Sequence, residues 1–148
     1  MPEERFRGHF TATIDSQGRL KIPTAFKVVF DKQYGPGLYI TSLNGDFITV
    51  YPMAVWEKVE NKLSDISDGV KDKFVNLTGF WGQQLSMDKM GRIQIHPRLR
   101  NKAGLNGEVV VIGQFDRLTI WDPATLERQI ESNPFTTEDR RELAKLGV

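Results

Sequence analysis

Apolar and polar residues alternate through residues 10–14, a period of two that is typical of a half-buried β-strand. The next four residues, Asp-Ser-Gln-Gly, favour a tight turn, because Asp can accept a hydrogen bond from the backbone two residues on and Gly tolerates a positive φ. Beyond the turn, Leu20 and Ile22 are expected to face inward again. The same alternation leaves Arg19 and Lys21 on the outward face.

This strand–turn–strand pattern returns in the second half of the chain. Aspartate, glycine, arginine and isoleucine all recur at a shift of 73 residues. The members of the two sets are Asp15, Gly18, Arg19 and Ile22, and Asp88, Gly91, Arg92 and Ile95. In the second copy Ile93 and Ile95 are again expected to face inward, which leaves Arg92 and Gln94 outward.

A second pair of matching blocks follows in the same order. Thr49-Val50-Tyr51 matches Thr119-Ile120-Trp121 at a shift of 70 residues. Two matches at nearly the same offset indicate a tandem duplication of a unit of roughly 70 residues, and such a repeat determines the architecture.

Each half carries the same series of expected elements. A helix follows the turn, then a hairpin, then a second helix opened by a proline, Pro52 or Pro123. The first hairpin has the clearest signal, since Asn44-Gly45-Asp46 lies between two apolar runs. Each unit is therefore predicted to be β-β-α-β-β-α.

The expected organisation has four parts. They are a first unit at residues 5–65, a bridging helix at 66–81, a second unit at 82–133 and a charged C-terminal tail at 134–148. In the bridging helix Val70, Phe74, Leu77 and Trp81 share one face. Units with only two hairpins each cannot readily close a core alone. The prediction is an α+β fold in which the two units interlock into one β-barrel with flanking helices.

Composition narrows the function further. The formal net charge of +1 does not by itself favour nucleic acid, but residues 86–106 hold five cations against one acid, Asp88. The absence of cysteine excludes disulfides and cysteine metal sites and suits the cytoplasm. No stretch is apolar enough to span a membrane, and the polar N-terminus does not resemble a signal peptide.

The recurring arginine has two compatible interpretations. Asp-x-x-x-Arg can be a hairpin closed by a local ion pair, although an exposed pair adds only about 0–1 kcal/mol and Lys would serve as well. Arginine at the same place twice favours a use for its planar fork of donors, on phosphate or on a guanine edge.

Other classes of function find less support. His9 and His96 are the only histidines, and neither has cysteine or paired carboxylates near it, so no enzyme, cofactor or metal site is expected. Trp56, Trp81 and Trp121 fall on patterned faces and are expected in the core, which leaves no stacking platform for RNA. A protein-interaction module would have to use residues 134–148, which are poor in apolar anchors.

Several blocks together resemble the MraZ family, bacterial transcriptional regulators with two AbrB/SpoVT-like swapped-hairpin units. The resemblance covers about residues 5–133. It rests on both Gly-Arg turns and on Phe6-Arg7-Gly8, Tyr51-Pro52, Trp56-Glu57, Val111-Ile112-Gly113-Gln114-Phe115 and Trp121-Asp122. His96 also matches an extra residue that the family has before its second proline. The resemblance implies a swapped-hairpin, double-psi-like barrel.

The resemblance also implies a function. It implies a sequence-specific DNA-binding repressor that binds short, G-rich direct repeats in double-stranded DNA upstream of its own division and cell-wall operon. The expected assembly is a ring of identical subunits, associated with the nucleoid in the cytoplasm.

The family's DNA-contacting arginine corresponds to Arg19, and Arg92 is its repeat-related partner, which faces either DNA or a neighbouring subunit. Lys21, Arg7 and Lys27 are expected on phosphates. The structural residues of the turns are Asp15, Gly18, Asp88 and Gly91.

Overall fold

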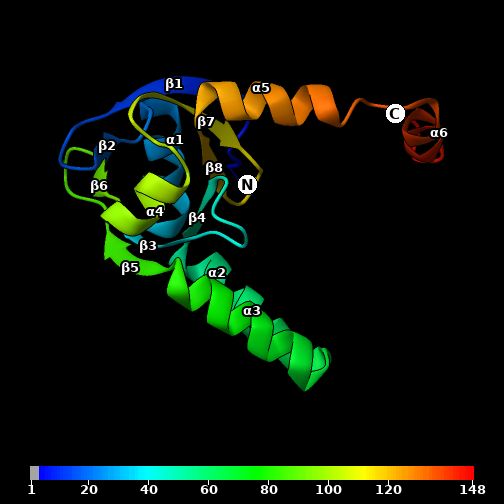
Figure 1. Cartoon of the computed structure of the whole chain (residues 1–148), viewed down its shortest axis with the longest axis horizontal. Coiled ribbons are helices and arrows are strands. Elements are labelled where there is room, and N and C mark those ends of the chain that lie inside the picture. The colour runs from blue at the N-terminus through cyan, green and yellow to red at the C-terminus, as the bar shows by residue number, and fades with distance from the viewer. Residues whose placement is uncertain (1–3) are drawn as a thin grey trace.

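A computed structural model describes residues 4–148 and contains one eight-stranded antiparallel sheet with helices around it (Figure 1). The strands are β1 (His9–Ile14), β2 (Arg19–Lys21), β3 (Gly37–Thr41), β4 (Ile48–Pro52), β5 (Gln83–Ser86), β6 (Arg92–Gln94), β7 (Gly107–Gly113) and β8 (Leu118–Trp121). The α-helices are α1 (Thr24–Val29), α2 (Met53–Lys62), α3 (Asp68–Phe80), α4 (Pro97–Lys102), α5 (Pro123–Ser132) and α6 (Thr137–Ala144). A π-helical turn, Phe30–Tyr34, extends α1, and a 3-10 turn, Leu63–Asp65, extends α2.

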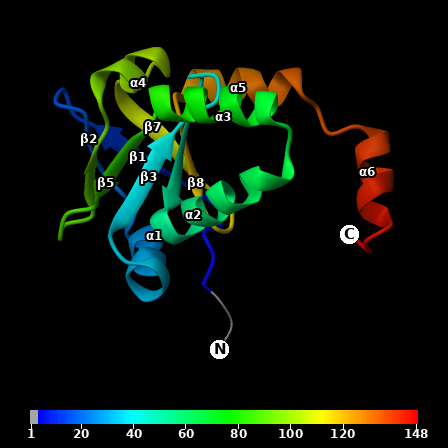
Figure 2. The same ribbon diagram turned by 90° about the horizontal axis from the view of Figure 1, so that it is seen from below.

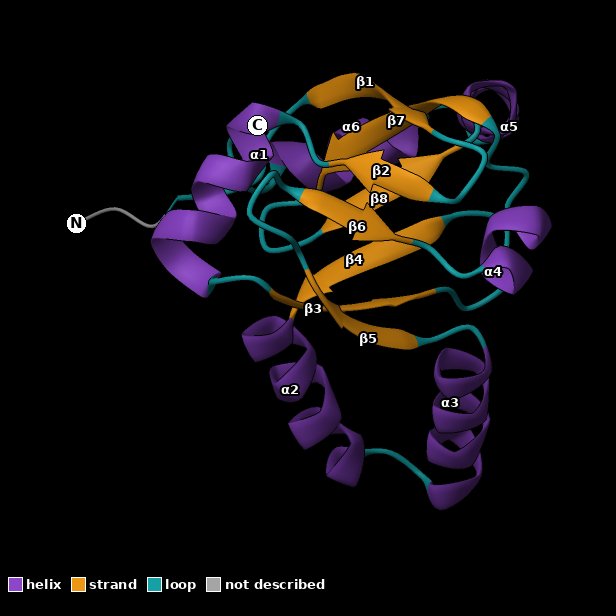
Figure 3. Ribbon diagram, turned by 90° about the vertical axis from the view of Figure 1, so that its left-hand side faces the viewer, coloured by secondary structure: helices purple, strands orange, loops and turns teal. Residues whose placement is uncertain are grey.

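The two halves of the chain share this sheet rather than forming one each. The strand order is β5-β3-β4-β8-β7-β1-β2-β6, so β1 pairs with β7, β3 with β5, β2 with β6 and β4 with β8 across the halves. The end strands β5 and β6 are joined through the second turn, where the Asp88 N–H donates to the Arg92 carbonyl at 3.0 Å. The predicted swapped-hairpin barrel, nearly closed, is confirmed (Figure 3).

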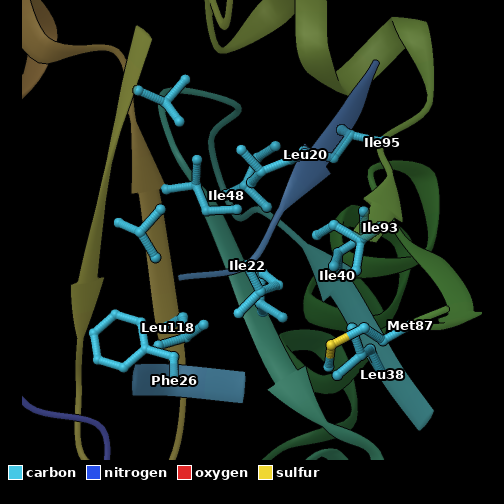
Figure 4. Close-up of a cluster of buried hydrophobic side chains, with 14 of the residues drawn as sticks. Leu20, Ile22, Phe26, Leu38, Ile40, Ile48, Met87, Ile93, Ile95 and Leu118 are labelled. Atoms are coloured by element: carbon cyan, nitrogen blue, oxygen red, sulfur yellow. The ribbon is translucent and has the colours of Figure 1, made fainter. Parts of the chain in front are cut away.

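The core lies inside this barrel and is built from both halves. Leu20, Ile22, Ile93 and Ile95, all expected to face inward, are fully buried or nearly so. Figure 4 shows them beside side chains of β3 and β4 such as Leu38. Since each half supplies part of one apolar cluster, neither half has a complete core of its own.

The helical hairpin of α2 and α3 projects from one side of the barrel (Figures 2 and 3). The apolar face expected on α3 is only partly covered: Val70 is 55% exposed and Leu77 42% exposed, whereas the Phe74 ring stacks on that of Trp56 at 6.1 Å between centroids. The buried residue of α3 is Thr78. Its carbonyl accepts hydrogen bonds from the Tyr39 hydroxyl at 2.9 Å and from the Thr41 hydroxyl at 2.8 Å, which fixes this end of α3 to strand β3.

The last two helices leave the barrel. Figures 1 and 2 both show α5 running outward and α6 standing apart at its far end. Helix α6 is closed by a capping box, in which the Thr136 hydroxyl accepts from the Asp139 N–H and the Asp139 carboxylate accepts from the Thr136 N–H. Its N-terminus is therefore stabilised locally, and none of its residues is buried.

The three tryptophans differ in how deeply they are buried. Trp56 and Trp121 are buried, as expected for core residues. Trp81 is only partly buried, and its ring meets Phe80 edge-on at 4.8 Å between centroids. Trp81 nevertheless packs against the core, at its edge, because the residue follows the end of α3.

Candidate nucleic-acid interface

The first Gly-Arg turn is organised around one carboxylate. Asp15 Oδ1 accepts from the backbone N–H groups of Gln17 and Arg19, each at 2.9 Å, and Asp15 Oδ2 accepts from Arg19 Nε at 2.9 Å. Gly18 has φ +83°, a left-handed value that a glycine adopts without steric cost. The sequence signals for a turn thus correspond to a single hydrogen-bonded loop.

The second turn repeats this arrangement. Asp88 Oδ1 accepts from the backbone N–H groups of Met90 and Arg92 at 2.9 Å, and Asp88 Oδ2 accepts from Arg92 Nε at 2.8 Å. Gly91 has φ +81°. Two turns 73 residues apart therefore hold their arginines in the same way.

Each aspartate orients its arginine without occupying the whole guanidinium. Only Nε is bonded to the carboxylate, and the terminal amino groups of Arg19 and Arg92 donate to no group within residues 4–148. The side chains are 47% and 49% exposed. An oriented guanidinium with four free N–H groups is suited to bidentate binding of a phosphate or of a guanine edge.

Both turn aspartates are held in their charged form. The pKa of Asp15 lies below its ordinary value, mainly because the backbone N–H of Arg19 donates to it; desolvation opposes this shift, and the hydrogen bond from the Arg19 side chain lowers the pKa further. The pKa of Asp88 is lowered in the same way by Arg92. The ion pairs are therefore intact at neutral pH.

The turns of the two halves support each other. The Gly18 carbonyl accepts from the Ile95 N–H at 2.9 Å, and the Gly91 carbonyl accepts from the Ile22 N–H at 2.8 Å. Between these contacts β2 and β6 pair antiparallel, with Leu20 opposite Ile93 at the centre. The two turns consequently lie at opposite ends of one short two-stranded ladder.

Four side chains project from the outer side of this ladder, and we call them the outward face: Arg19, Lys21, Arg92 and Gln94. Arg19 lies opposite Gln94, and Lys21 lies opposite Arg92. Arg19 and Arg92 are diagonal neighbours, about 7–8 Å apart on such a ladder. Figure 3 shows β2 and β6 at the front of the barrel with no helix over them.

The charges on the outward face repel one another. Lys21 and Arg92 are directly opposite, a placement of like charges that destabilises a sheet. No ion pair or hydrogen bond within the described chain holds the Lys21 side chain. Arg92 is balanced by its ion pair with Asp88, whereas the described chain gives Lys21 no acidic partner. An unbalanced cation on an exposed strand is suited to an anionic ligand.

Two further cations cover the turns from the opposite half. The side chain of Lys27, on α1, lies against Gly91, and that of Arg100, on α4, lies against Gly18. Lys27 is also bonded to Asp31, at 2.7 Å between Nζ and Oδ2, while Arg100 Nη1 donates to the Ser16 carbonyl at 3.3 Å. Lys27 is thus close to the outward face but already paired with an acid.

The fifth expected DNA-binding residue lies elsewhere. Arg7 precedes β1, at the end of that strand opposite to the turn. It follows Phe6, whose N–H donates to the Phe115 carbonyl at 2.8 Å. The six-residue strand β1 lies between Arg7 and Asp15 and spans about 20 Å. The structure therefore groups Arg19, Lys21 and Arg92, brings Lys27 near them, and leaves Arg7 apart.

Sequence reasoning did not single out Gln94 or Arg100 as site residues. The repeat could have identified both residues, because Gln94 and Arg100 occupy the positions of Lys21 and Lys27 at the shift of 73 residues.

The histidine that follows β6 has a structural role. His96 Nδ1 accepts from the Leu99 N–H at 3.2 Å and so caps α4, while Nε2 lies 3.3 Å from the Trp81 carbonyl. Within residues 4–148, no three His, Cys, Asp or Glu side chains gather to hold a metal ion. Among the helices of the same residues, none has the length and apolar character to cross a membrane.

The interlocked units and their paired turns define a tandem swapped-hairpin barrel with two oriented arginines on one face. A family model described as "MraZ protein, putative antitoxin-like" matches residues 82–146, which extends beyond residue 133 into the C-terminal tail. The chain belongs to the MraZ family of transcriptional regulators.

Individual relatives cover nearly the whole chain. "Transcriptional regulator MraZ" of Acidobacterium capsulatum is 39% identical over 145 residues, 97% of this chain and 99% of the relative. The protein of that name from Koribacter versatilis is 39% identical over 146 residues, again 97% and 99% of the two chains. That of Escherichia coli is 32% identical over 131 residues, 86% of each. These names describe regulators rather than enzymes, in agreement with the sequence.

Proposed function

We propose that this chain binds double-stranded DNA through the outward face of β2 and β6 and regulates transcription by doing so. The observation that carries the proposal is the pair of arginines, Arg19 and Arg92, each oriented by an aspartate and each with its terminal amino groups unused. The names of the relatives support the same class of function.

The dimensions of the ladder suit the major groove. That groove is about 12 Å wide and admits a two-stranded β-ribbon. Arg19 and Arg92 would each bind O6 and N7 of a guanine, the commonest specific contact between a protein and DNA. Lys21 would bind phosphate, which positions the protein without specifying sequence.

Lys27 and Arg7 would contribute less. A phosphate would have to compete with the Asp31 carboxylate for the Lys27 ammonium group. Arg7 can meet DNA only if the duplex continues along the barrel beyond the turn, since it lies at the far end of β1.

One subunit has too few cations for tight binding at physiological salt. Each phosphate contact weakens as salt competes for it, and the outward face supplies only three positive side chains. We propose that several copies assemble into a ring, so that adjacent outward faces bind adjacent short direct repeats at high effective concentration. The exposed apolar residues of α3, including Val70, Leu77 and Phe80, are available for such contacts.

The proposed regulatory role is repression. Bound at G-rich direct repeats upstream of its own division and cell-wall operon, a ring would occlude the promoter. The protein would then be found in the cytoplasm, associated with the nucleoid.

The test is to identify the DNA that the protein selects. Purified protein is mixed with sheared genomic DNA of its source at about 150 mM salt, where non-specific binding is weak, and the retained fragments are sequenced. We expect enrichment of a fragment upstream of this gene that contains tandem G-containing boxes. Retention equal to that of a sample without protein would contradict sequence-specific binding, and enrichment elsewhere in the genome would contradict autoregulation.

A further inference from the structure

The two ends of the outward face are related by the repeat but are not chemically equal. Arg19 and Arg92 are equivalent, and so are the positions of Lys21 and Gln94. At one end an arginine therefore lies opposite an amide, and at the other end an arginine lies opposite a lysine. On the outward face, the pseudo-two-fold symmetry is broken at this pair of positions.

Gln94 is held in place next to the first turn. Its Nε2 donates to the Gln17 carbonyl at 3.2 Å, so the amide is fixed beside Arg19. A side-chain amide has two N–H groups and one carbonyl oxygen. After the bond to Gln17, one N–H and Oε1 remain, because no other hydrogen bond within residues 4–148 involves this side chain.

The remaining donor and acceptor match one DNA base. Glutamine binds adenine with its carbonyl oxygen on N6 and its N–H on N7, as arginine binds guanine through O6 and N7. Side chains directly opposite on a ladder have Cβ atoms about 4.5–5.5 Å apart, and successive base pairs are about 3.4 Å apart. Arg19 and Gln94 can therefore reach neighbouring base pairs together. Lys21 offers a point charge, which suits phosphate.

We propose that Gln94 determines specificity by binding an adenine beside the guanine of Arg19, while the end with Lys21 and Arg92 lacks this second base contact. This inference rests on the proposed DNA binding by the outward face. A face with two equal ends would favour an inverted repeat, because its own symmetry would be matched by the site. A face with unequal ends binds its site in one orientation only. The sites of a direct repeat all have the same orientation, so they suit such a face.

The experiment is selection from a random double-stranded library, with sequencing of the bound pool, for wild type and three variants. Wild type should enrich a site with adenine next to guanine at one end only. Gln94→Glu should change that adenine to cytosine, since a carboxylate accepts from cytosine N4, and binding to the wild-type site should fall about 5- to 150-fold.

Lys21→Gln should produce the complementary change. It places an amide opposite Arg92, so adenine should now be enriched at both ends and the selected site should become closer to a palindrome. Gln129→Ala, a change at an exposed position of α5, should enrich the wild-type site. Thermal unfolding of each variant establishes that the barrel is intact.

The outcomes separate the two proposals. A wild-type pool without any enriched motif would contradict sequence-specific DNA binding by the outward face, and the role of Gln94 with it. A clear wild-type motif that both Gln94→Glu and Lys21→Gln leave unchanged would overturn only the role of Gln94. A purely structural Gln94 would lower affinity on substitution without exchanging one preferred base for another.

Discussion

At the scale of single residues, the two turn glycines have the same backbone conformation but different neighbours. A Cβ on Gly18 would lie 2.7 Å from the Ile95 carbonyl oxygen and 2.7 Å from Arg100 Nη1. A Cβ on Gly91 would meet mainly the Lys27 side chain, at 2.8 Å from Cδ. The Ile95 backbone is held by its own hydrogen bond to the Gly18 carbonyl and cannot easily move aside, whereas a lysine side chain can.

Gly18→Ala should therefore destabilise the protein more than Gly91→Ala. Both substitutions force a non-glycine residue to a positive φ, a cost of about 1–2 kcal/mol, and only Gly18→Ala adds a clash with backbone. Gly69→Ala is the matched control, because it lies in α3 with nothing within 4 Å and should be neutral or stabilising. Urea unfolding measures all three, and equal losses for Gly18 and Gly91 would contradict this account of the turns.

The chemistry of each turn was predictable from sequence because it is local. Asp15, Gly18 and Arg19 bond within five residues of one another. The covering of each turn by a cation from the other half was not predictable in the same way. Arg100 reaches Ser16 across 84 residues, a contact that depends on the interlocked register.

At the scale of elements, β2 and β6 are too short to be stable alone. Each has three residues and is held by its partner strand and by the carboxylate of the adjoining turn. The stability of this ladder should therefore depend on the charge of Asp15 and Asp88.

Acid should weaken the turns through these two groups. Their pKa values are lowered in the folded state, so their contribution to stability is complete above the unfolded pKa of about 4 and is lost as pH falls through the lower folded values. The double variant Asp15→Asn/Asp88→Asn should be less stable at neutral pH and lose less on acidification. The measurement is Tm against pH, with Asp72→Asn on α3 as control. Parallel curves for the double variant and wild type would contradict this role.

Elements with a clear local pattern were predicted well, and those set by packing were not. The β-β-α-β-β-α order follows from alternation, prolines and turn residues. The helix expected after the first turn instead changes to a π-turn at Phe30, where the Gly35 N–H donates to the Phe30 carbonyl at 2.7 Å. Phe30 is fully buried with its ring 4.8 Å from that of Phe6, a contact between distant segments that has no signature in local sequence.

At the scale of the whole molecule, the barrel leaves several apolar side chains uncovered. They lie on separate elements: Phe10 on β1, Val70, Leu77 and Phe80 on α3, and Phe115 in the turn before β8. Exposed apolar residues on different elements of one subunit suit head-to-tail contacts, which close into a ring when the rotation between neighbouring subunits divides a full turn.

The assembly should therefore be a closed oligomer of uniform mass. Native mass spectrometry of the full chain should give one species, a whole multiple of 16.9 kDa, that does not grow with concentration. Leu77→Glu/Phe80→Glu should reduce it to smaller species while the barrel stays folded, because both side chains are exposed in the subunit. A monomer at micromolar concentration would contradict the ring, and so would open polymers of unlimited length.

The central claim is that Arg19 and Arg92 on the outward face bind DNA. The most direct test is the Kd of Arg19→Ala/Arg92→Ala for the DNA site that wild type selects, set against its Kd for a scrambled duplex. The matched control is Lys71→Ala/Lys73→Ala, which removes the same charge from exposed positions of α3.

Two bidentate contacts of about 1–3 kcal/mol each predict that the arginine variant loses at least about 30-fold in affinity for the selected site. The control should keep the wild-type preference for that site over the scrambled duplex. An arginine variant that stays folded and binds the selected site as tightly as wild type would contradict the claim.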